Sequence, residues 1–187
     1  SSSAEHATVR GIVTLVDPAL YVQDSTGAIE VMTSAPAESV RVGDEVEAQG
    51  DLSVSNLAPA LSHASLRILW PNSHVVPIVV TPFELASGRS QGRLVETEGV
   101  FLAEFTAPDD ELFLRMENDS QEFYAVVSQD NAGSLPKHFE PGSRLRLRGI
   151  VSSNSAFTRN LVPFAILLPS AAGVQLIHIT GTLDWEQ

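Results

Sequence analysis

The residues of this sequence that could carry chemistry are its histidines, its acids and a few clustered polar side chains. No histidine pairs with another at the spacing of metal ligands; the five are His6, His63, His74, His138 and His178. The absence of cysteine excludes disulfides, thiolate nucleophiles and cysteine-based metal sites. Acids are plentiful, but no spacing singles out a pair of carboxylates. We therefore expect no enzyme, no metal site and no cofactor, and the enzymatic alternative is a carboxylate-based hydrolase or transferase.

A stripe of arginines lies in the segment PGSRLRLRG, residues 141–149. Arg144, Arg146 and Arg148 alternate with leucines, so they point to one side of a predicted strand. Two interpretations stay open. One is pairing with acids of a neighbouring strand, such as Glu96 and Glu98. The other is contact with an acidic or anionic partner, which could be a second copy of the chain in a homodimer.

The loop SNSAFTRN, residues 153–160, joins an aromatic residue to a cation and an amide: Phe157, Arg159 and Asn160. An aromatic side chain exposed in a polar loop is the kind of anchor that interfaces use. The alternative is that Phe157 caps the end of a barrel. On the first interpretation this loop belongs to a ligand or partner site.

Charge limits the partners of the chain. Its 187 residues carry a net charge of −12, and Lys137 is the only lysine. Because nucleic-acid affinity comes largely from Lys and Arg that neutralise phosphates, this balance weighs against nucleic acid. The apolar runs, such as VVPIVV at residues 75–80, are far shorter than the ~20 residues of a membrane span. We expect membrane contact only through segments outside this chain.

Two similar halves must position these side chains. Each half reads as strand, hairpin, turn, strand, loop and strand, and the phrase VGDEVEAQG at residues 42–50 matches the arginine phrase at 141–149. In both phrases the apolar positions face inward, and each closes on a glycine, Gly50 or Gly149. Glycines also interrupt the first strand of each half, at Gly11 and Gly99. Glycines inside strands mark the bends at which a small barrel turns its corners.

The pattern predicts an all-β protein of two tandem OB-fold-like five-stranded barrels. A β-sandwich would explain the alternation but not the glycines that recur at the same places. We expect the first barrel over residues 1–72, a linker over 73–90 and the second barrel with a C-terminal connection over 91–187. The linker should hold an extended strip and one short helix, with Thr81 as N-cap and Glu84 completing a capping box. A further helical turn is expected at 134–139.

OB-folds bind ligands on the face of their second and third strands and with the loops after strands one and four. In the first barrel that face offers Tyr21 and Gln23. The loop after strand four of the second barrel is the one with Phe157, Arg159 and Asn160. These residues, with the arginine stripe, are the predicted ligand or partner site.

Several segments together resemble the tandem OB-like extracytoplasmic (periplasmic) input region of bacterial sensor histidine kinases and diguanylate cyclases: VRGIVTLVDPALYVQDSTGAIEV, VTPFELASGRSQGRLVETEGV, FEPGSRLRLRGIV and FAILLPSAAGVQLI. The resemblance covers residues 8–177 and brings no residue-level binding motif. It implies a non-enzymatic sensor region for signal transduction, as in two-component systems, which binds an unknown small ligand or protein. It also implies that the full-length chain is a membrane protein. The alternative is a nucleic-acid-binding OB-fold protein.

Overall fold

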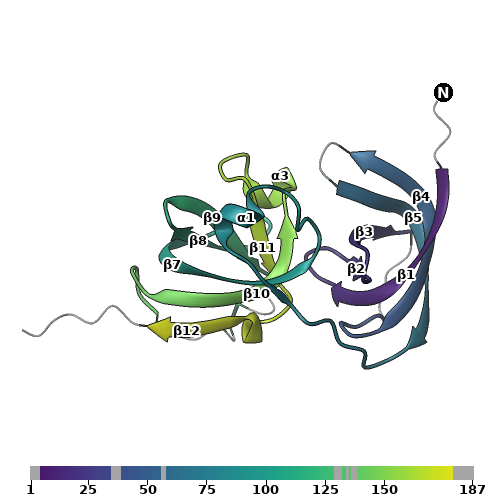
Figure 1. Ribbon diagram of the computed structural model, residues 1–187, viewed down its shortest axis with the longest axis horizontal. Coiled ribbons are helices and arrows are strands. Elements are labelled where there is room, and N and C mark those ends of the chain that lie inside the picture. The colour runs from purple at the N-terminus through teal and green to yellow at the C-terminus, as the bar shows by residue number, and fades with distance from the viewer. Residues whose placement is uncertain are drawn as a thin grey trace, which may run out of the picture.

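A computed structural model gives the fold and describes residues 5–34, 39–55, 58–128, 132–133, 135 and 139–178. The chain forms two β-barrels that lie next to each other, joined by a linker (Figure 1). The helical turn expected at 134–139 falls largely outside the described residues. Among the described helices, none has the length and apolar character that crossing a membrane requires.

The first barrel closes in the strand order of an OB-fold. Its strands are β1 (Glu5–Leu15), β2 (Tyr21–Gln23), β3 (Ala28–Thr33), β4 (Glu45–Ser55) and β5 (Ala58–Trp70). They follow the order β1-β2-β3-β5-β4, and β1 pairs with β4 to close the barrel. The β3–β5 pairing is parallel, whereas the other pairings are antiparallel. The predicted five-stranded barrel is confirmed.

The second barrel repeats this order. Its strands are β7 (Leu94–Thr106), β8 (Leu112–Asn118), β9 (Gln121–Val127), β10 (Arg144–Ser152) and β11 (Ala165–Leu168). Strand β10 pairs with β7 to close the barrel, and β9 pairs with β11 in parallel. Two strands are added at the edges: β6 (Ile78–Val79) beside β7, and β12 (Val174–His178) beside β10. The short helix α3 (Ser155–Thr158) lies between β10 and β11, and the 3-10 helix η1 (Ala171–Gly173) precedes β12.

The repeated phrase has the same role in both barrels. Its apolar residues are fully buried inside the barrels: Val46 and Ala48 in the first, Leu145 and Leu147 in the second. A Cβ added at Gly50 would lie 2.6 Å from the carbonyl oxygen of Ser62, and one at Gly149 would lie 2.4 Å from that of Leu167. Each glycine therefore makes room for the backbone of the neighbouring strand. The nearest atoms at both positions belong to the hydrogen-bonded neighbouring strand and not to the opposite wall of the barrel.

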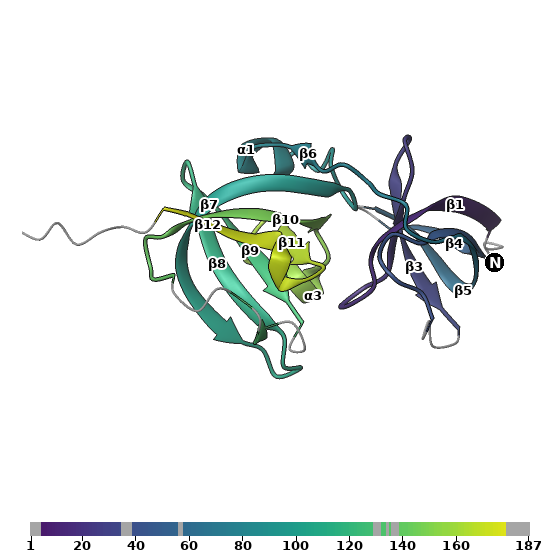
Figure 2. The same ribbon diagram turned by 90° about the horizontal axis from the view of Figure 1, so that it is seen from below.

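The linker runs along both barrels and is hydrogen-bonded to each of them (Figure 2). The backbone N–H of Ser73 donates to the carbonyl of Gly43 at 2.7 Å, and the N–H of Val80 donates to that of Glu96 at 3.0 Å. Helix α1 (Pro82–Leu85) then begins with the predicted capping box. The Thr81 hydroxyl accepts from the N–H of Glu84, and the Glu84 carboxylate accepts from the N–H of Thr81.

A shared apolar cluster joins the barrels. Leu15 and Tyr21 of the first barrel pack with residues on the outer face of the second: Phe113, Tyr124, Val126, Ile150, Phe157, Ala165 and Leu167. Strict alternation would place Leu15 on the same face as Val13, but the two lie in different clusters. A register shift between Val13 and Leu15 moves Leu15 into the shared cluster.

Polar contacts fix the same junction. The side-chain carbonyl of Gln23 accepts from the backbone N–H of Leu94 at 2.8 Å, and Arg93 donates to the carbonyl of Thr26 at 2.7 Å. A Cβ added at Gly92 would lie 3.2 Å from the Cβ of Ala28, so the backbones approach closely. The two barrels therefore meet in a specific, packed interface.

Candidate ligand-binding cleft

A cleft of about 360 Å³ lies between the barrels, beside strands β2 and β3 of the first. One wall is the start of β5, and the other is the loop after β10, which contains α3 and faces the ends of β4 and β5 in Figure 1. OB-folds bind ligands beside their second and third strands, and β2 and β3 of the first barrel border this cleft; the loop with α3 comes from the second barrel. The lining residues are Tyr21, Glu30, Ala58, Pro59, Ala60, Gln91, Ser153, Asn154, Ser155 and Asn160.

Tyr21 contributes a neutral phenol to this cleft. Its side chain is almost fully buried, and its hydroxyl lies 3.5 Å from Oε2 of Glu30 and hydrogen-bonds with the Ser152 side chain. Burial, with the nearby Glu30 carboxylate, raises the pKa of Tyr21 to about 12. The phenol is therefore protonated at neutral pH and acts as a hydrogen-bond donor.

Glu30 is a half-buried carboxyl group in the cleft. Burial raises its pKa above the usual range, and the hydrogen bond from Tyr21 only partly opposes this effect. Among the described residues, no Lys, Arg or His forms an ion pair with Glu30. Ionised Glu30 therefore has a neutral phenol at the limit of hydrogen-bond distance as its neighbour.

The sequence analysis grouped Phe157, Arg159 and Asn160 in one site, but in the structure their side chains have different surroundings. Phe157 is buried in the shared cluster, so the prediction of an exposed anchor is wrong and the capping alternative is closer. Arg159 lies with its guanidinium carbon 5.5 Å from the centroid of the Phe113 ring. Arg159 and Asn160 both have left-handed backbone, with φ of 56° and 55°, and Asn160 lines the cleft.

The two predicted residues on β2 have different positions. Tyr21 lines the cleft, as does Asn160 from the loop of the second barrel. Gln23 is 5% exposed and is bonded to Leu94, so it belongs to the interface and not to an open ligand face. The physical reason is that the second barrel covers this part of β2.

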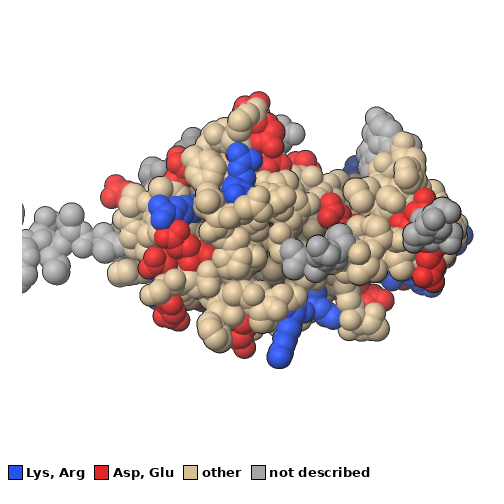
Figure 3. All heavy atoms as spheres, turned by 90° about the horizontal axis from the view of Figure 1, so that it is seen from above, with Lys and Arg blue, Asp and Glu red and all other residues tan. Residues whose placement is uncertain are grey.

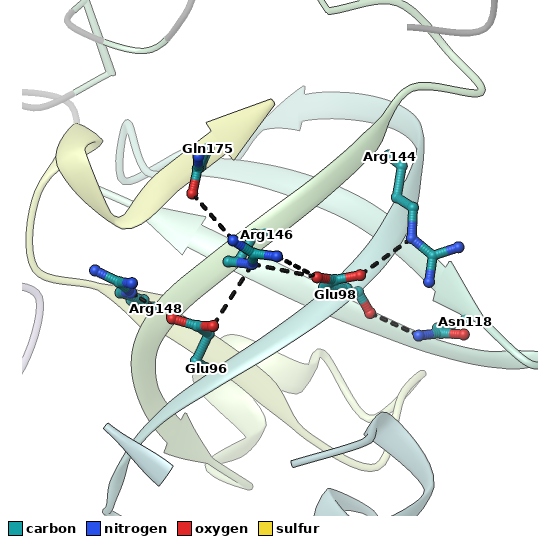
Figure 4. Close-up of polar contacts among 7 residues, drawn as sticks. All are labelled: Glu96, Glu98, Asn118, Arg144, Arg146, Arg148 and Gln175. Carbon is teal, nitrogen blue, oxygen red and sulfur yellow. Dashed lines mark hydrogen bonds and ion pairs between the residues drawn. The ribbon is translucent and has the colours of Figure 1, made fainter. Parts of the chain in front are cut away.

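The arginine stripe is paired within the second barrel (Figure 4). Glu98 accepts from Arg144 at 3.2 Å and from Arg146 at 2.9 Å, and Glu96 accepts from Arg148. The hydrogen bonds from Arg146 and then Arg144 lower the pKa of Glu98. The structure thus shows the first of the two alternatives, cross-strand pairing, and none of the three arginines lines the cleft.

A second hollow, of about 390 Å³, lies between α1, β7 and the β8–β9 turn. Its acids include Glu84, Glu96 and Glu98. Glu84 is held in the capping box, and the other two pair with the arginines of β10. Because three of its four acids, all except Asp119, already have partners, this hollow is a weaker candidate than the inter-barrel cleft.

Sequence reasoning passed over two features. Residues 88–92, GRSQG, spell the Gly-x-Ser-x-Gly pattern of nucleophilic serines. The segment leads from a helix into a strand, the reverse of the strand-to-helix elbow that such serines occupy. Within the described part of the chain, the histidines that form hydrogen bonds do so with Asp51 and not with Ser90. The second feature is Glu30, which the tight turn at Asp24–Gly27 places opposite Tyr21; the hairpin register could have revealed it.

Within the described ranges, no group of three His, Asp or Glu side chains is placed to hold a metal ion. The basic residues are also dispersed. On the face drawn in Figure 3, the described arginines form separate spots, several of them next to acids, with wide uncharged surface between them. Among the residues that the structure describes, the cleft accordingly offers hydrogen-bonding groups and one carboxylate, and none of its lining residues is a cation.

Comparisons with known proteins extend only to the fold. No family model and no curated protein matches the sequence. The HINb domain of p204 is 15% identical over 95% of this chain and 100% of that domain, with a TM-score of 0.42. The asparaginyl-tRNA synthetase from Pyrococcus horikoshii is 15% identical over 55% of this chain, with a TM-score of 0.41. A putative aspartyl-tRNA synthetase from Leishmania major Friedlin is 6% identical over 60% of this chain, with a TM-score of 0.44. The matches span 23% of each synthetase.

Proposed function

We propose that this chain is a non-enzymatic recognition region that takes a small polar ligand in the inter-barrel cleft. We further propose that it is the extracytoplasmic input region of a bacterial signalling protein. The observation that carries the proposal is the construction of the cleft, whose lining comes from both barrels. A ligand there would contact both sides of a packed interface.

The interface gives such a ligand a means to act. A bound molecule shifts a conformational equilibrium only by its difference in affinity for two states. Since the cleft lies beside the shared cluster and the Gln23–Leu94 bond, a small change in the angle between the barrels would alter the ligand's contacts. Occupancy and barrel arrangement are therefore coupled in this proposal.

Nucleic-acid binding is the competing candidate for an OB-fold chain. Proteins that bind single strands combine a basic groove with aromatic side chains on which bases stack. Here Phe113, Phe123 and Tyr124 are buried, and the three arginines of β10 pair with acids. These contacts, with the net charge of −12, favour the first proposal.

A titration separates the two candidates. A labelled single-stranded oligonucleotide, DNA or RNA, would be added at low salt and followed by fluorescence anisotropy. We expect no saturable binding. Saturable binding that weakens steeply with added salt would support the nucleic-acid candidate and contradict ours.

The cleft is tested by filling it. Ala60→Trp places an indole in the lining, whereas Ala103→Trp places the same side chain on an exposed position of β7 as the control. We expect small molecules that raise the melting temperature of the wild type to lose that effect in Ala60→Trp alone. The proposed extracytoplasmic location is tested separately, with a phosphatase that is active only outside the cytoplasm. The phosphatase is fused behind this chain in the natural protein, and we expect the fusion protein to have phosphatase activity.

A further inference from the structure

The carboxylate of Glu30 sets the chemistry of the inter-barrel cleft. Several acids on the strands have a cation: Glu45 pairs with Arg10, Glu47 with Arg67, and Glu96 and Glu98 with the arginines of β10. Glu30 is also on a strand and is half-buried, yet no described cation pairs with it. A partly desolvated carboxylate without a counter-ion is unfavourable, so the site favours a positive group.

The surroundings of Glu30 complement a cation and not an anion. The Tyr21 phenol lies beside it, and Ser153, Ser155 and Asn160, whose side chains carry hydroxyls and an amide, also line the cleft. These groups include oxygen atoms that accept hydrogen bonds from N–H donors. Since the described lining residues include no Lys, Arg or His, Glu30 is the one charged side chain among them, and it would repel an anionic ligand.

The size of the cleft limits the ligand. A volume of about 360 Å³ is near the lower end of the range of ligand pockets. The apolar atoms of Ala58, Pro59 and Ala60 line one wall, next to the carboxylate. This arrangement suits a short apolar body with a charged end.

We propose that the cleft binds a small organic cation, a primary ammonium or a guanidinium group on a short apolar stem, with Glu30 as its counter-ion. The proposal rests on the proposed function, because it assigns a ligand class to the same cleft. The N–H donors of the ligand meet the Glu30 carboxylate, and its stem lies along the start of β5. Asn160 supplies an amide on the opposite wall.

The test compares three probes of similar shape and different charge: n-butylammonium, 1-butanol and butyrate. Binding is followed through the backbone amide shifts of Gln91 and Ser153 in nuclear magnetic resonance spectra. We expect n-butylammonium to shift these amides saturably, and 1-butanol and butyrate to bind far more weakly. In Glu30→Gln, n-butylammonium should bind about tenfold more weakly or worse, the loss expected for a hydrogen bond to a charged group.

The control variant is Glu104→Gln, which removes the same charge from an exposed position of β7 and should keep wild-type affinity. If n-butylammonium and 1-butanol bind the cleft equally and Glu30→Gln binds both, the cleft is a site for neutral ligands and the cation assignment is overturned. Tightest binding by butyrate overturns it too. If no probe shifts the cleft amides, while Ala60→Trp changes no ligand response, the cleft as a site is overturned together with the proposed function.

Discussion

The side chain of Gln23 accepts a hydrogen bond from the backbone N–H of Leu94 at 2.8 Å, which joins the second strand of one barrel to the first strand of the other. Gln23 is 5% exposed, so the bond is shielded from water. A buried polar group of this kind is costly to leave without its partner. The bond therefore favours one arrangement of the barrels, the one that forms the cleft.

Removing this acceptor should destabilise the protein. In Gln23→Leu the N–H of Leu94 loses its partner, and we expect a loss of ~1–3 kcal/mol in the free energy of unfolding. Urea denaturation measures the loss. The matched control is Gln49→Leu on an exposed position of β4, which should change stability by less than about 0.5 kcal/mol. Equal effects of the two substitutions would show that the interface bond contributes nothing specific.

The two closing glycines should be equally intolerant of a side chain. Gly50→Ala and Gly149→Ala each force a Cβ against a carbonyl oxygen of the next strand, at 2.6 and 2.4 Å. We expect each to cost ~1–3 kcal/mol through overpacking. Gly27→Ala is the control, since a Cβ there meets nothing within 4 Å. Unchanged thermal unfolding of either closing-glycine variant would refute the shared role.

The pairing of Glu98 predicts a pH dependence. Because Arg146 and Arg144 lower the pKa of Glu98 in the folded chain, the ionised form stabilises the fold. This contribution is complete at neutral pH and disappears as the pH falls through the lowered folded-state pKa. A double-mutant cycle of Glu98→Gln and Arg146→Met should give a coupling of about 0.2–1 kcal/mol at pH 7, smaller in high salt. A coupling unchanged at acidic pH would argue against the pair.

Ionisation of Glu30 should have the opposite effect on the stability of the fold. Burial raises its folded-state pKa, so ionised Glu30 destabilises the fold without a ligand. The effect is absent below the pKa of an unfolded-chain glutamate and complete above the raised value. We expect Glu30→Gln to have a higher melting temperature than the wild type at neutral pH and an equal one in strong acid. Calorimetry at both pH values provides the test, and a lower melting temperature at neutral pH would mean that Glu30 already has a partner.

Much of the fold could be predicted from the sequence because each strand's inner face obeys simple rules. Alternation identified Val46 and Leu145 as interior positions, and the Thr81–Glu84 spacing identified the capping box. The recurrence of Gly50 and Gly149 favoured barrels over a sandwich. The alternation and the capping box are local signals, whereas the recurrence of the glycines becomes visible only when the two halves of the chain are compared.

The candidate site could not be predicted in the same way, because it depends on which parts of the other barrel cover the outer faces of the strands. Local sequence patterns contain no information about these contacts. Tyr21 and Gln23 lie on the same strand, yet one borders the cleft and the other is enclosed by the second barrel. Phe157 resembled an exposed anchor because its neighbours in the sequence are polar, while its contacts come from the shared cluster. The arginine stripe had two open interpretations until β7 was placed beside β10.

The central claim is that the two barrels are held in one arrangement, with the cleft already formed between them. Residual dipolar couplings of backbone amides measure the orientation of each barrel in solution. The account predicts that couplings from β1–β5 and from β7–β11 fit a single alignment tensor of one magnitude, in the wild type without ligand. Two tensors of different magnitude would show that the barrels move independently, and would contradict a cleft built by their interface.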